Sequence, residues 1–262
     1  MSNNTKLIVG ILALFASIPS FSSAPDYDEW KNPYVNQINR LPMHVWFNPD
    51  KNSDNYLTLN GQWRFYWTEN PSEKPQGFEA PGYDDSSWAI IGVPGNWELN
   101  GYGDPMYVNV GYPWRGWFTS APPAVPAEHN HVGSYRKTID IPANWSGKEV
   151  LMHIGSATSC VYLWVNGKFV GYSEDSKLEA EFDVTKYLRK GKNLFAMQVF
   201  RWCDGTYLED QDFFRLSGIS RDCYLWARDK ASIRDIRITT PLSADYKDGI
   251  MTAEVVLSKA AK

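Results

Sequence analysis

The sequence predicts an all-β protein built around a jelly-roll β-sandwich. Short apolar runs recur at close spacing between turn residues, whereas helical periodicity is scarce. Aromatic residues make up 15% of the 262-residue chain, as is typical of all-β cores and of the walls of sugar sites. Long loops between the apolar runs favour a jelly roll whose loops gather at one end.

The first strand-like segment is residues 57–67, in which apolar and polar residues alternate. If Asn60 and Gly61 form a bulge or a turn, five apolar side chains share one face: Leu57, Leu59, Trp63, Phe65 and Trp67. Residues 88–93 predict another short strand. Residues 95–133 have no regular period, and a loop this long that carries so many aromatic residues indicates a functional role.

Six further strands are predicted at close spacing: residues 133–141, 149–154, 160–165, 169–172, 193–200 and 223–227. Asn166 and Gly167 separate two of them, which is a strong signal for a two-residue hairpin turn. Residues 182–188 are the one plausible helical turn, with Asp183 as its cap and Gly191 at the end of the segment.

A second unit begins after the predicted first domain, residues 57–229. Residues 233–240 and 249–258 each alternate in the manner of a strand. Two strands cannot bury a core by themselves. We therefore expect residues 230–262 to be the first strands of an incomplete second β-domain that continues beyond Lys262.

The N-terminal residues 1–24 have the pattern of a secretory signal peptide. Lys6 precedes an apolar stretch at residues 7–18, and residues 22–24 offer a small-residue cleavage site. This pattern predicts a periplasmic or secreted protein with no membrane segment after cleavage, and the alternative is an uncleaved N-terminal anchor. Residues 25–56 lack periodicity and predict an extended arm that lies on the fold.

Charge and cysteine content exclude some classes of partner. The net charge is −4 and the pI is about 5.6, which argues against nucleic acid as a partner. Three widely spaced cysteines, Cys160, Cys203 and Cys223, indicate buried free thiols, although one pair could be oxidised in an oxidising compartment. His129 and His131 are close in sequence, but no third metal ligand is evident beside them.

Residues 202–222 are the most informative stretch of the chain. They contain four carboxylates in one short loop: Asp204, Glu209, Asp210 and Asp212. Such a cluster between buried strands needs cations, Arg side chains, backbone N–H groups or a polyhydroxyl ligand as partners. A solvated turn is the plainer interpretation, but Tyr207, Phe213 and Phe214 would be unusual in one.

Several ordered blocks resemble one known family. They include MYVNVGYP at residues 106–113, YLEDQDFFR at residues 207–215 and SGISRD at residues 217–222. Over roughly residues 32–238 the chain resembles the N-terminal domains of lac-type bacterial β-galactosidases, which belong to glycoside hydrolase family 2. The SGISRD block is general to the wider family, whereas the other two blocks are more particular to β-galactosidases.

The resemblance implies a jelly-roll sugar-binding domain that is followed by an immunoglobulin-like domain and then a TIM barrel. In such enzymes the acid/base and nucleophile glutamates of the retaining mechanism lie in the barrel. We therefore expect no catalytic residue in this segment and no activity from it alone. The whole protein would be a secreted retaining β-galactosidase that hydrolyses terminal non-reducing β-D-galactosides.

The resemblance also assigns individual residues. Asn109 matches an asparagine that contacts the substrate, and Asp212 matches an aspartate that contacts the galactose hydroxyls and helps to ligate sodium. Both roles suit the chemistry, because a carboxylate accepts hydrogen bonds from vicinal hydroxyls and an amide both donates and accepts. Sodium and magnesium are expected in the full-length enzyme, with neither site complete here.

Alternatives remain for these residues. Asp212 could instead pair with Arg215 or Arg221, and Asn109 could be an ordinary turn residue. Two neighbouring carboxylates, Glu209 and Asp210, are expected to support the loop by bonding to backbone and Arg groups. Asp204 is expected to be solvated, with a peripheral cation site as its alternative.

Alternatives also remain for the whole chain. It could be a stand-alone carbohydrate-binding module, or part of a family 2 hydrolase that acts on another β-glycoside. It could also be an inactive assembly domain. The arm at residues 32–44 resembles a segment that holds subunits together, so a homo-oligomer of the full-length protein is expected.

Overall fold

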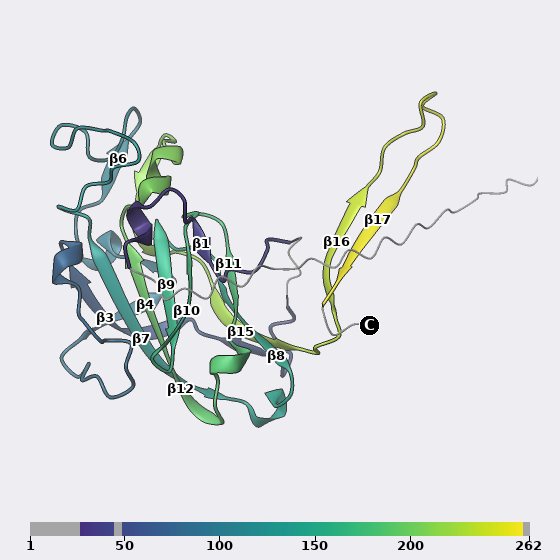
Figure 1. The fold of residues 1–262 in the computed structure, drawn as a ribbon, viewed down its shortest axis with the longest axis horizontal. Helices are drawn as coiled ribbons and strands as arrows, with labels where there is room; N and C mark the ends of the chain where they lie inside the picture. Colours follow the sequence, from purple (N-terminus) through teal and green to yellow (C-terminus); the bar gives the residue numbers. More distant parts are fainter. Residues whose placement is uncertain (1–26, 45–48, 259–262) are drawn as a thin grey trace, which may run out of the picture.

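The computed structural model describes residues 27–44 and 49–258, and most of these residues form or connect β-strands (Figure 1). The two main sheets pack face to face as a β-sandwich, which confirms the predicted all-β fold class. The proposed signal peptide at residues 1–24 and the end of the chain at Lys262 lie outside the described residues. No helix in the described ranges is long and apolar enough to cross a membrane.

The two sheets are antiparallel, with seven strands in the larger sheet and four in the smaller. In spatial order the larger sheet contains β1 (Gln37–Ile38), β10 (Lys168–Ser173), β9 (Cys160–Val165), β12 (Gly191–Phe200), β7 (Val132–Ile141), β3 (Gly61–Thr68) and β4 (Ala89–Val93). The smaller sheet contains β11 (Ala180–Asp183), β8 (Glu149–Ile154), β15 (Cys223–Arg228) and β2 (Tyr56–Thr58).

The remaining strands form two-stranded ladders, and the helices are single 3₁₀ turns. The ladders pair β5 (Gly95–Asn96) with β14 (Gly218–Ile219), β6 (Met106–Val108) with β13 (Phe213–Arg215), and β16 (Ile233–Thr239) with β17 (Thr252–Leu257). The 3₁₀ turns are η1 (Glu29–Lys31), η2 (Pro71–Glu73), η3 (Glu98–Asn100), η4 (Ala143–Trp145), η5 (Thr185–Tyr187) and η6 (Asp204–Leu208).

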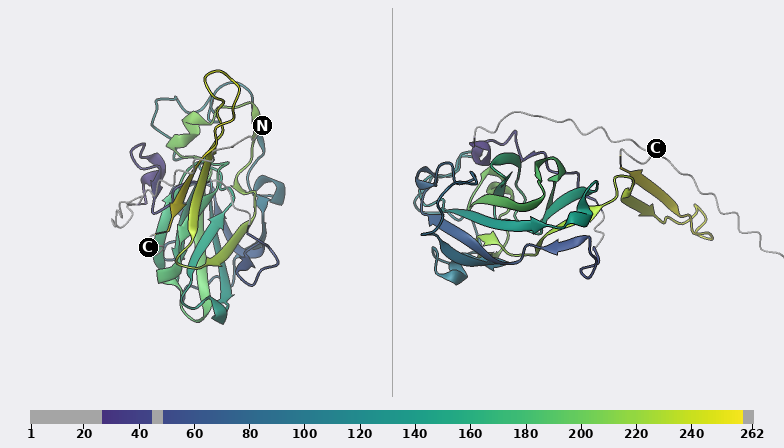
Figure 2. Two further views of the ribbon diagram at one scale, coloured as in Figure 1. Left: turned by 90° about the vertical axis from the view of Figure 1, so that its right-hand side faces the viewer. Right: turned by 90° about the horizontal axis from the view of Figure 1, so that it is seen from below.

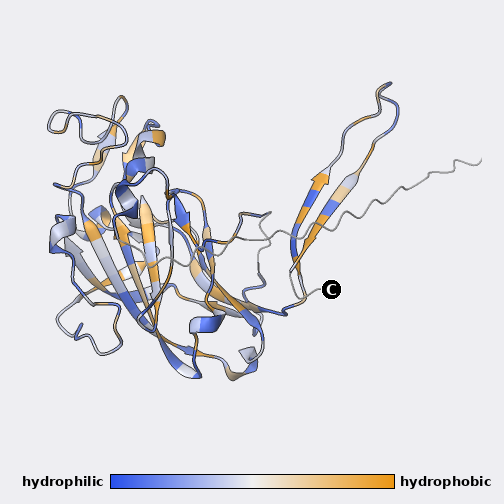
Figure 3. Cartoon of the chain, viewed as in Figure 1, coloured by the Kyte–Doolittle hydropathy of each residue, from blue (hydrophilic) through white to orange (hydrophobic). Residues whose placement is uncertain are grey.

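The strand β9 shows where the core lies. Every residue of β9 is buried, because both faces of the larger sheet are covered at this point. Val161 and Leu163 face the smaller sheet, in the main core between the two sheets. Tyr162 and Trp164 face the other way, in a second cluster that Trp30 of the N-terminal arm joins. Figure 3 shows apolar and polar residues alternating along many of the strands.

The prediction for residues 57–67 was wrong in one respect. These residues do not form one interrupted strand, since β2 pairs with β15 in the smaller sheet and β3 pairs with β7 in the larger. The chain changes sheets at Asn60, whose Nδ2 donates to Asp222 Oδ1 at 2.9 Å. The apolar side chains on either side of Asn60 still share the core, because the two sheets enclose it from opposite sides.

Two local predictions had different outcomes. The hairpin turn is confirmed, because Asn166 and Gly167 join β9 to β10 with φ values of 53° and 79°. The helical turn at residues 182–188 is wrong in its start and its end, because Phe182 belongs to β11 and Gly191 begins β12. The remainder is the 3₁₀ turn η5, and Asp183 Oδ1 accepts a hydrogen bond from Thr185 N at 2.9 Å.

The β6–β13 ladder and the β16–β17 hairpin lie at opposite ends of the molecule. Figure 1 shows β6 among the loops at one end, whereas the β16–β17 hairpin projects from the other. Most of the exposed large apolar side chains after residue 230 belong to this hairpin and its loop: Ile233, Ile238, Leu242, Tyr246, Ile250, Met251 and Leu257. The division into domains proposed from the sequence stays a prediction.

Candidate functional site

The β6–β13 ladder brings the two predicted substrate residues together. Phe213 is opposite Val108 and Phe214 is opposite Tyr107, so the antiparallel register places Asp212 opposite Asn109 at the next step. Residues directly opposite each other in a ladder project from the same face. Two residues that are far apart in the sequence therefore meet on one surface, which we call the site ribbon (residues 106–109 and 212–215).

The outer face of the site ribbon is polar at one end and aromatic along its length. Tyr107 Oη donates a hydrogen bond to Asp212 Oδ1 at 2.5 Å, and this bond raises the pKa of Tyr107. The rings of Tyr107 and Phe214 lie 5.4 Å apart, and their side chains are 55% and 62% exposed. Asp212 and Asn109 are also exposed. A carboxylate and an amide thus stand beside two accessible aromatic rings.

Asp212 is not an arginine partner in the described residues, so that alternative is wrong. Arg215 binds elsewhere in the loop: Nη2 donates to Gln211 O at 3.1 Å, and Nη1 donates to Glu209 O. Arg221 Nη1 donates to Lys177 O at 2.5 Å. The carboxylate of Asp212 therefore remains at the surface of the ribbon.

The predicted supporting role of Glu209 and Asp210 is confirmed. Glu209 accepts from Ser176 N at 3.0 Å and from Ser176 Oγ at 2.5 Å, which ties the loop to the segment after β10. Asp210 Oδ1 lies 3.4 Å from Arg215 Nη2. The two carboxylates hold the loop, whereas Asp212 beside them is left for another partner.

The expectation that Asp204 is solvated is wrong. Its Oδ1 atom is buried and has no hydrogen-bond partner among the described residues, and burial raises the pKa of Asp204. It interacts with Glu174, another buried carboxyl group, which sequence reasoning missed. Burial, and then the charge of Asp204, raise the pKa of Glu174 to about 8. The position of Glu174 directly after the strand β10, whose last four residues are buried, is the signal that could have indicated its burial.

No group of three or more His, Cys, Asp or Glu residues that could hold a metal occurs in the described part of the chain. The carboxylates of Glu174 and Asp204 are a pair. Oxygen donors of this kind suit hard cations, and the unpaired Oδ1 of Asp204 is a free acceptor within the pair. The residues present therefore fit a hard cation that takes its other ligands elsewhere.

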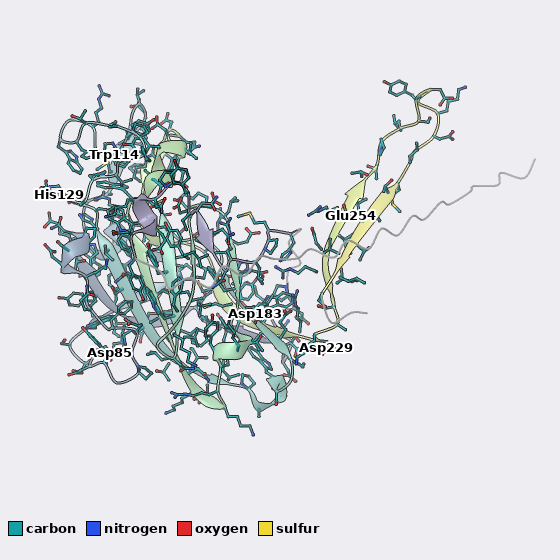
Figure 4. All side chains as sticks on the ribbon, in the orientation of Figure 1. Asp85, Trp114, His129, Asp183, Asp229 and Glu254 are labelled. Atoms are coloured by element: carbon teal, nitrogen blue, oxygen red, sulfur yellow. The ribbon has the colours of Figure 1, made fainter. Side chains whose placement is uncertain are left out.

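Most aromatic residues of the long 95–133 loop pack on one another instead of lining a site. Trp114 is fully buried, with its ring 5.0 Å from Tyr207 and 5.6 Å from Trp202. Trp117 is 44% exposed and its ring lies 5.3 Å from that of His129. Figure 4 shows Trp114 and His129 at the end of the sandwich where the loops gather. The loop thus forms a small aromatic core that supports the site ribbon.

The cysteine prediction is confirmed. Cys160, Cys203 and Cys223 are free and buried. Burial raises the pKa of Cys223 to about 12 and raises that of Cys203 well above its ordinary value. These thiols are packing residues of the sandwich.

The sequence matches a family model and a group of curated proteins. Residues 56–229 match the model of the glycosyl hydrolases family 2 sugar binding domain. A β-galactosidase of Priestia megaterium is 40% identical over 238 residues, which cover 86% of this chain and 23% of that protein. A β-galactosidase of Vibrio cholerae is 37% identical, with 93% of this chain and 24% of that protein covered. The chain spans about a quarter of the length of these relatives.

Solved structures of similar fold have more distant sequences. A β-glucuronidase from an uncultured Clostridium superposes with a TM-score of 0.61 at 21% identity, covering 84% of this chain and 36% of that one. A β-glucuronidase from Ruminococcus gnavus gives a TM-score of 0.58 at 18% identity, covering 83% and 36%. At these identities the likeness concerns the fold alone.

Proposed function

Because the chain belongs to the sugar-binding domain family of the family 2 glycosyl hydrolases, we propose that it completes the galactose subsite of a secreted retaining β-galactosidase. The similarity to β-galactosidases at about 40% identity supports this substrate class. The observation that carries the proposal is the pairing of Asn109 with Asp212 on the exposed face of the site ribbon.

The chemistry of this face suits a galactose ring. One carboxylate accepts hydrogen bonds from two vicinal hydroxyls, and such charge-assisted bonds are stronger than neutral ones. The amide of Asn109 can donate to one hydroxyl and accept from another. Tyr107 orients Asp212 through its hydrogen bond, and the neighbouring Phe214 offers an apolar surface for the C–H face of a sugar.

Cations belong to the same proposal. Asp212 would ligate a sodium ion together with groups from the remainder of the protein, because a carboxylate oxygen suits a hard monovalent cation. A magnesium ion would suit the carboxylates of Glu174 and Asp204, where the unpaired Oδ1 is a free ligand. Either cation would compensate negative charge in the acidic loop.

Bond cleavage is assigned to the part of the protein outside this segment. A retaining glycosidase needs two carboxyl groups about 5 Å apart, one as nucleophile and one as acid/base. We propose that both glutamates lie in a barrel, so the isolated segment has no hydrolytic activity. A homo-oligomer in which the N-terminal arm contributes to subunit contacts is part of the same proposal.

Substitution of Asp212 tests the proposal in the full-length protein. Asp212→Ala removes the carboxylate that would bind the sugar hydroxyls, and we expect KM for an aryl β-galactoside to rise about tenfold or more. The sodium dependence of the rate should weaken as well. Asp140→Ala is the matched control, because Asp140 is an exposed acid on β7, outside the site ribbon.

Three outcomes would contradict the proposal. One is an unchanged KM together with unchanged sodium dependence in Asp212→Ala. Another is preferential hydrolysis of aryl β-glucuronides or β-mannosides, which would favour a family 2 hydrolase for another β-glycoside. The third is sugar binding by a protein that lacks any barrel, which would favour a stand-alone binding module.

A further inference from the structure

A small pocket lies behind the site ribbon, on the face opposite Asp212. Phe213 and Arg215 of β13 line it, together with Ser159, Ser176, Lys177 and Arg201. Its solvent volume is about 20 Å³, which is room for one or two water-sized species. A pyranose ring is far too large for this space, so the pocket is distinct from a sugar subsite.

Two buried guanidinium groups each leave one donor unused in this pocket. Arg201 is 5% exposed and Arg215 is 8% exposed, and neither Nε atom has a hydrogen-bond partner within the described ranges. The terminal nitrogens are engaged: Arg201 Nη1 binds His131 Nδ1 at 3.1 Å, and Arg201 Nη2 donates to Asp104 O at 3.2 Å. A buried donor without a partner is costly, so an acceptor in the pocket would stabilise the fold.

The charge around the pocket is positive. Lys177, Arg201 and Arg215 contribute three positive charges, against one carboxylate, Glu209, that Ser176 already binds. A second carboxylate, Glu98, interacts electrostatically with Arg201. Burial, and then the positive charges of Arg221 and Arg215, lower the pKa of Lys177. An anion would compensate the excess positive charge.

We propose that this pocket binds a small monovalent inorganic anion of the size of chloride. The Nε–H groups of Arg201 and Arg215 donate to it, and the ammonium group of Lys177 supplies further positive charge. Because Arg215 and Phe213 belong to β13, the bound anion stabilises the ribbon that carries the sugar residues on its other face. This role is separate from the proposed sugar function and does not depend on it.

The test compares chloride with a bulky anion. The purified protein is titrated with sodium chloride at constant ionic strength, with sodium isethionate as the replacement salt, and the melting temperature is followed. We expect a saturable rise for the wild type. In Lys177→Met the chloride concentration at half-saturation should rise about tenfold, since a charge-assisted interaction is lost. Lys192→Met removes an exposed charge on β12 and should behave like the wild type.

A second measurement locates the anion directly. Crystals of the wild type grown or soaked with bromide should show an anomalous peak between the side chains of Arg201 and Arg215. Equal melting curves in chloride and isethionate would overturn the proposal. A chloride effect of the same size in all three proteins, or bromide peaks only at other places, would do so as well.

Discussion

Glu174 and Asp204 show how single residues set the behaviour of the acidic loop. Glu174 Oε1 accepts a hydrogen bond from Tyr172 Oη at 2.8 Å, which favours the charged form of the carboxyl group. Burial and the charge of Asp204 act in the opposite direction and prevail. Without a cation, ionisation of this pair is therefore unfavourable in the folded protein.

The pH dependence of stability should reveal Glu174. Its pKa rises from an ordinary 4.5 to about 8 on folding. The stabilisation linked to the proton is therefore full below about pH 4.5 and is lost as pH rises toward 8. We expect Glu174→Gln to remove up to roughly 3 kcal/mol of this loss, measured by denaturant unfolding between about pH 5 and pH 8.

A control and a cation test accompany this prediction. Glu128 is exposed, so Glu128→Gln should follow the wild-type pH profile. Magnesium ions should stabilise the wild type at about pH 8 and have much less effect on Glu174→Gln. Parallel pH profiles for the wild type and Glu174→Gln would show that this carboxyl does not titrate in the range.

Among the elements, β7 positions the long loop through one glycine. A Cβ atom on Gly133 would overlap the ring of Trp97 and would lie 2.8 Å from Phe65 Cε2. Trp97 is fully buried, and its backbone N–H donates to Ser217 O at 3.1 Å. The close approach of β7 to Trp97 therefore helps to fix the start of the loop against the segment that follows the site ribbon.

Gly133→Ala should disturb this packing. The added methyl group has no space, so we expect the free energy of unfolding to fall by about 1–3 kcal/mol. Gly92→Ala on the neighbouring strand β4 is the matched control, because a Cβ atom there meets nothing within 4 Å. Equal stability of the two variants in denaturant titrations would contradict the assigned role of Gly133.

The same elements show what the sequence can predict. Strands such as β8 and β9 were predicted with their observed ends, because their apolar runs are bounded by turn residues. The split between β2 and β3 was missed because a strand that crosses to the facing sheet keeps the same alternation toward the core. The pairing of Asn109 with Asp212 depends on a register between distant segments, which the pattern of neither segment contains.

At the scale of the whole molecule, Glu181 links the parts of the chain. Its Oε2 atom lies 2.9 Å from His44 Nε2 in the arm and 3.7 Å from Arg234 Nη1 in β16. Its Oε1 atom lies 3.4 Å from His153 Nδ1 on β8 and accepts from Trp226 Nε1 on β15 at 3.3 Å. One buried carboxylate on β11 thus contacts the arm, the smaller sheet and the C-terminal hairpin.

Loss of this charge should loosen the whole assembly. Burial by itself would raise the pKa of Glu181, but hydrogen bonds to His153 and His44 and the charges of His44 and Arg234 outweigh it and hold that pKa well below its usual range. Glu181→Gln keeps the shape but leaves these partners without their anion, so we expect a loss of about 3 kcal/mol of stability. The loss should be full above about pH 4.5 and should diminish as pH falls toward the folded pKa, since protonated wild-type Glu181 resembles the variant. Limited proteolysis should also release the arm or the hairpin faster in Glu181→Gln than in Glu128→Gln. Retention of full stability near neutral pH together with unchanged proteolysis would show that the arm and the hairpin are held without Glu181.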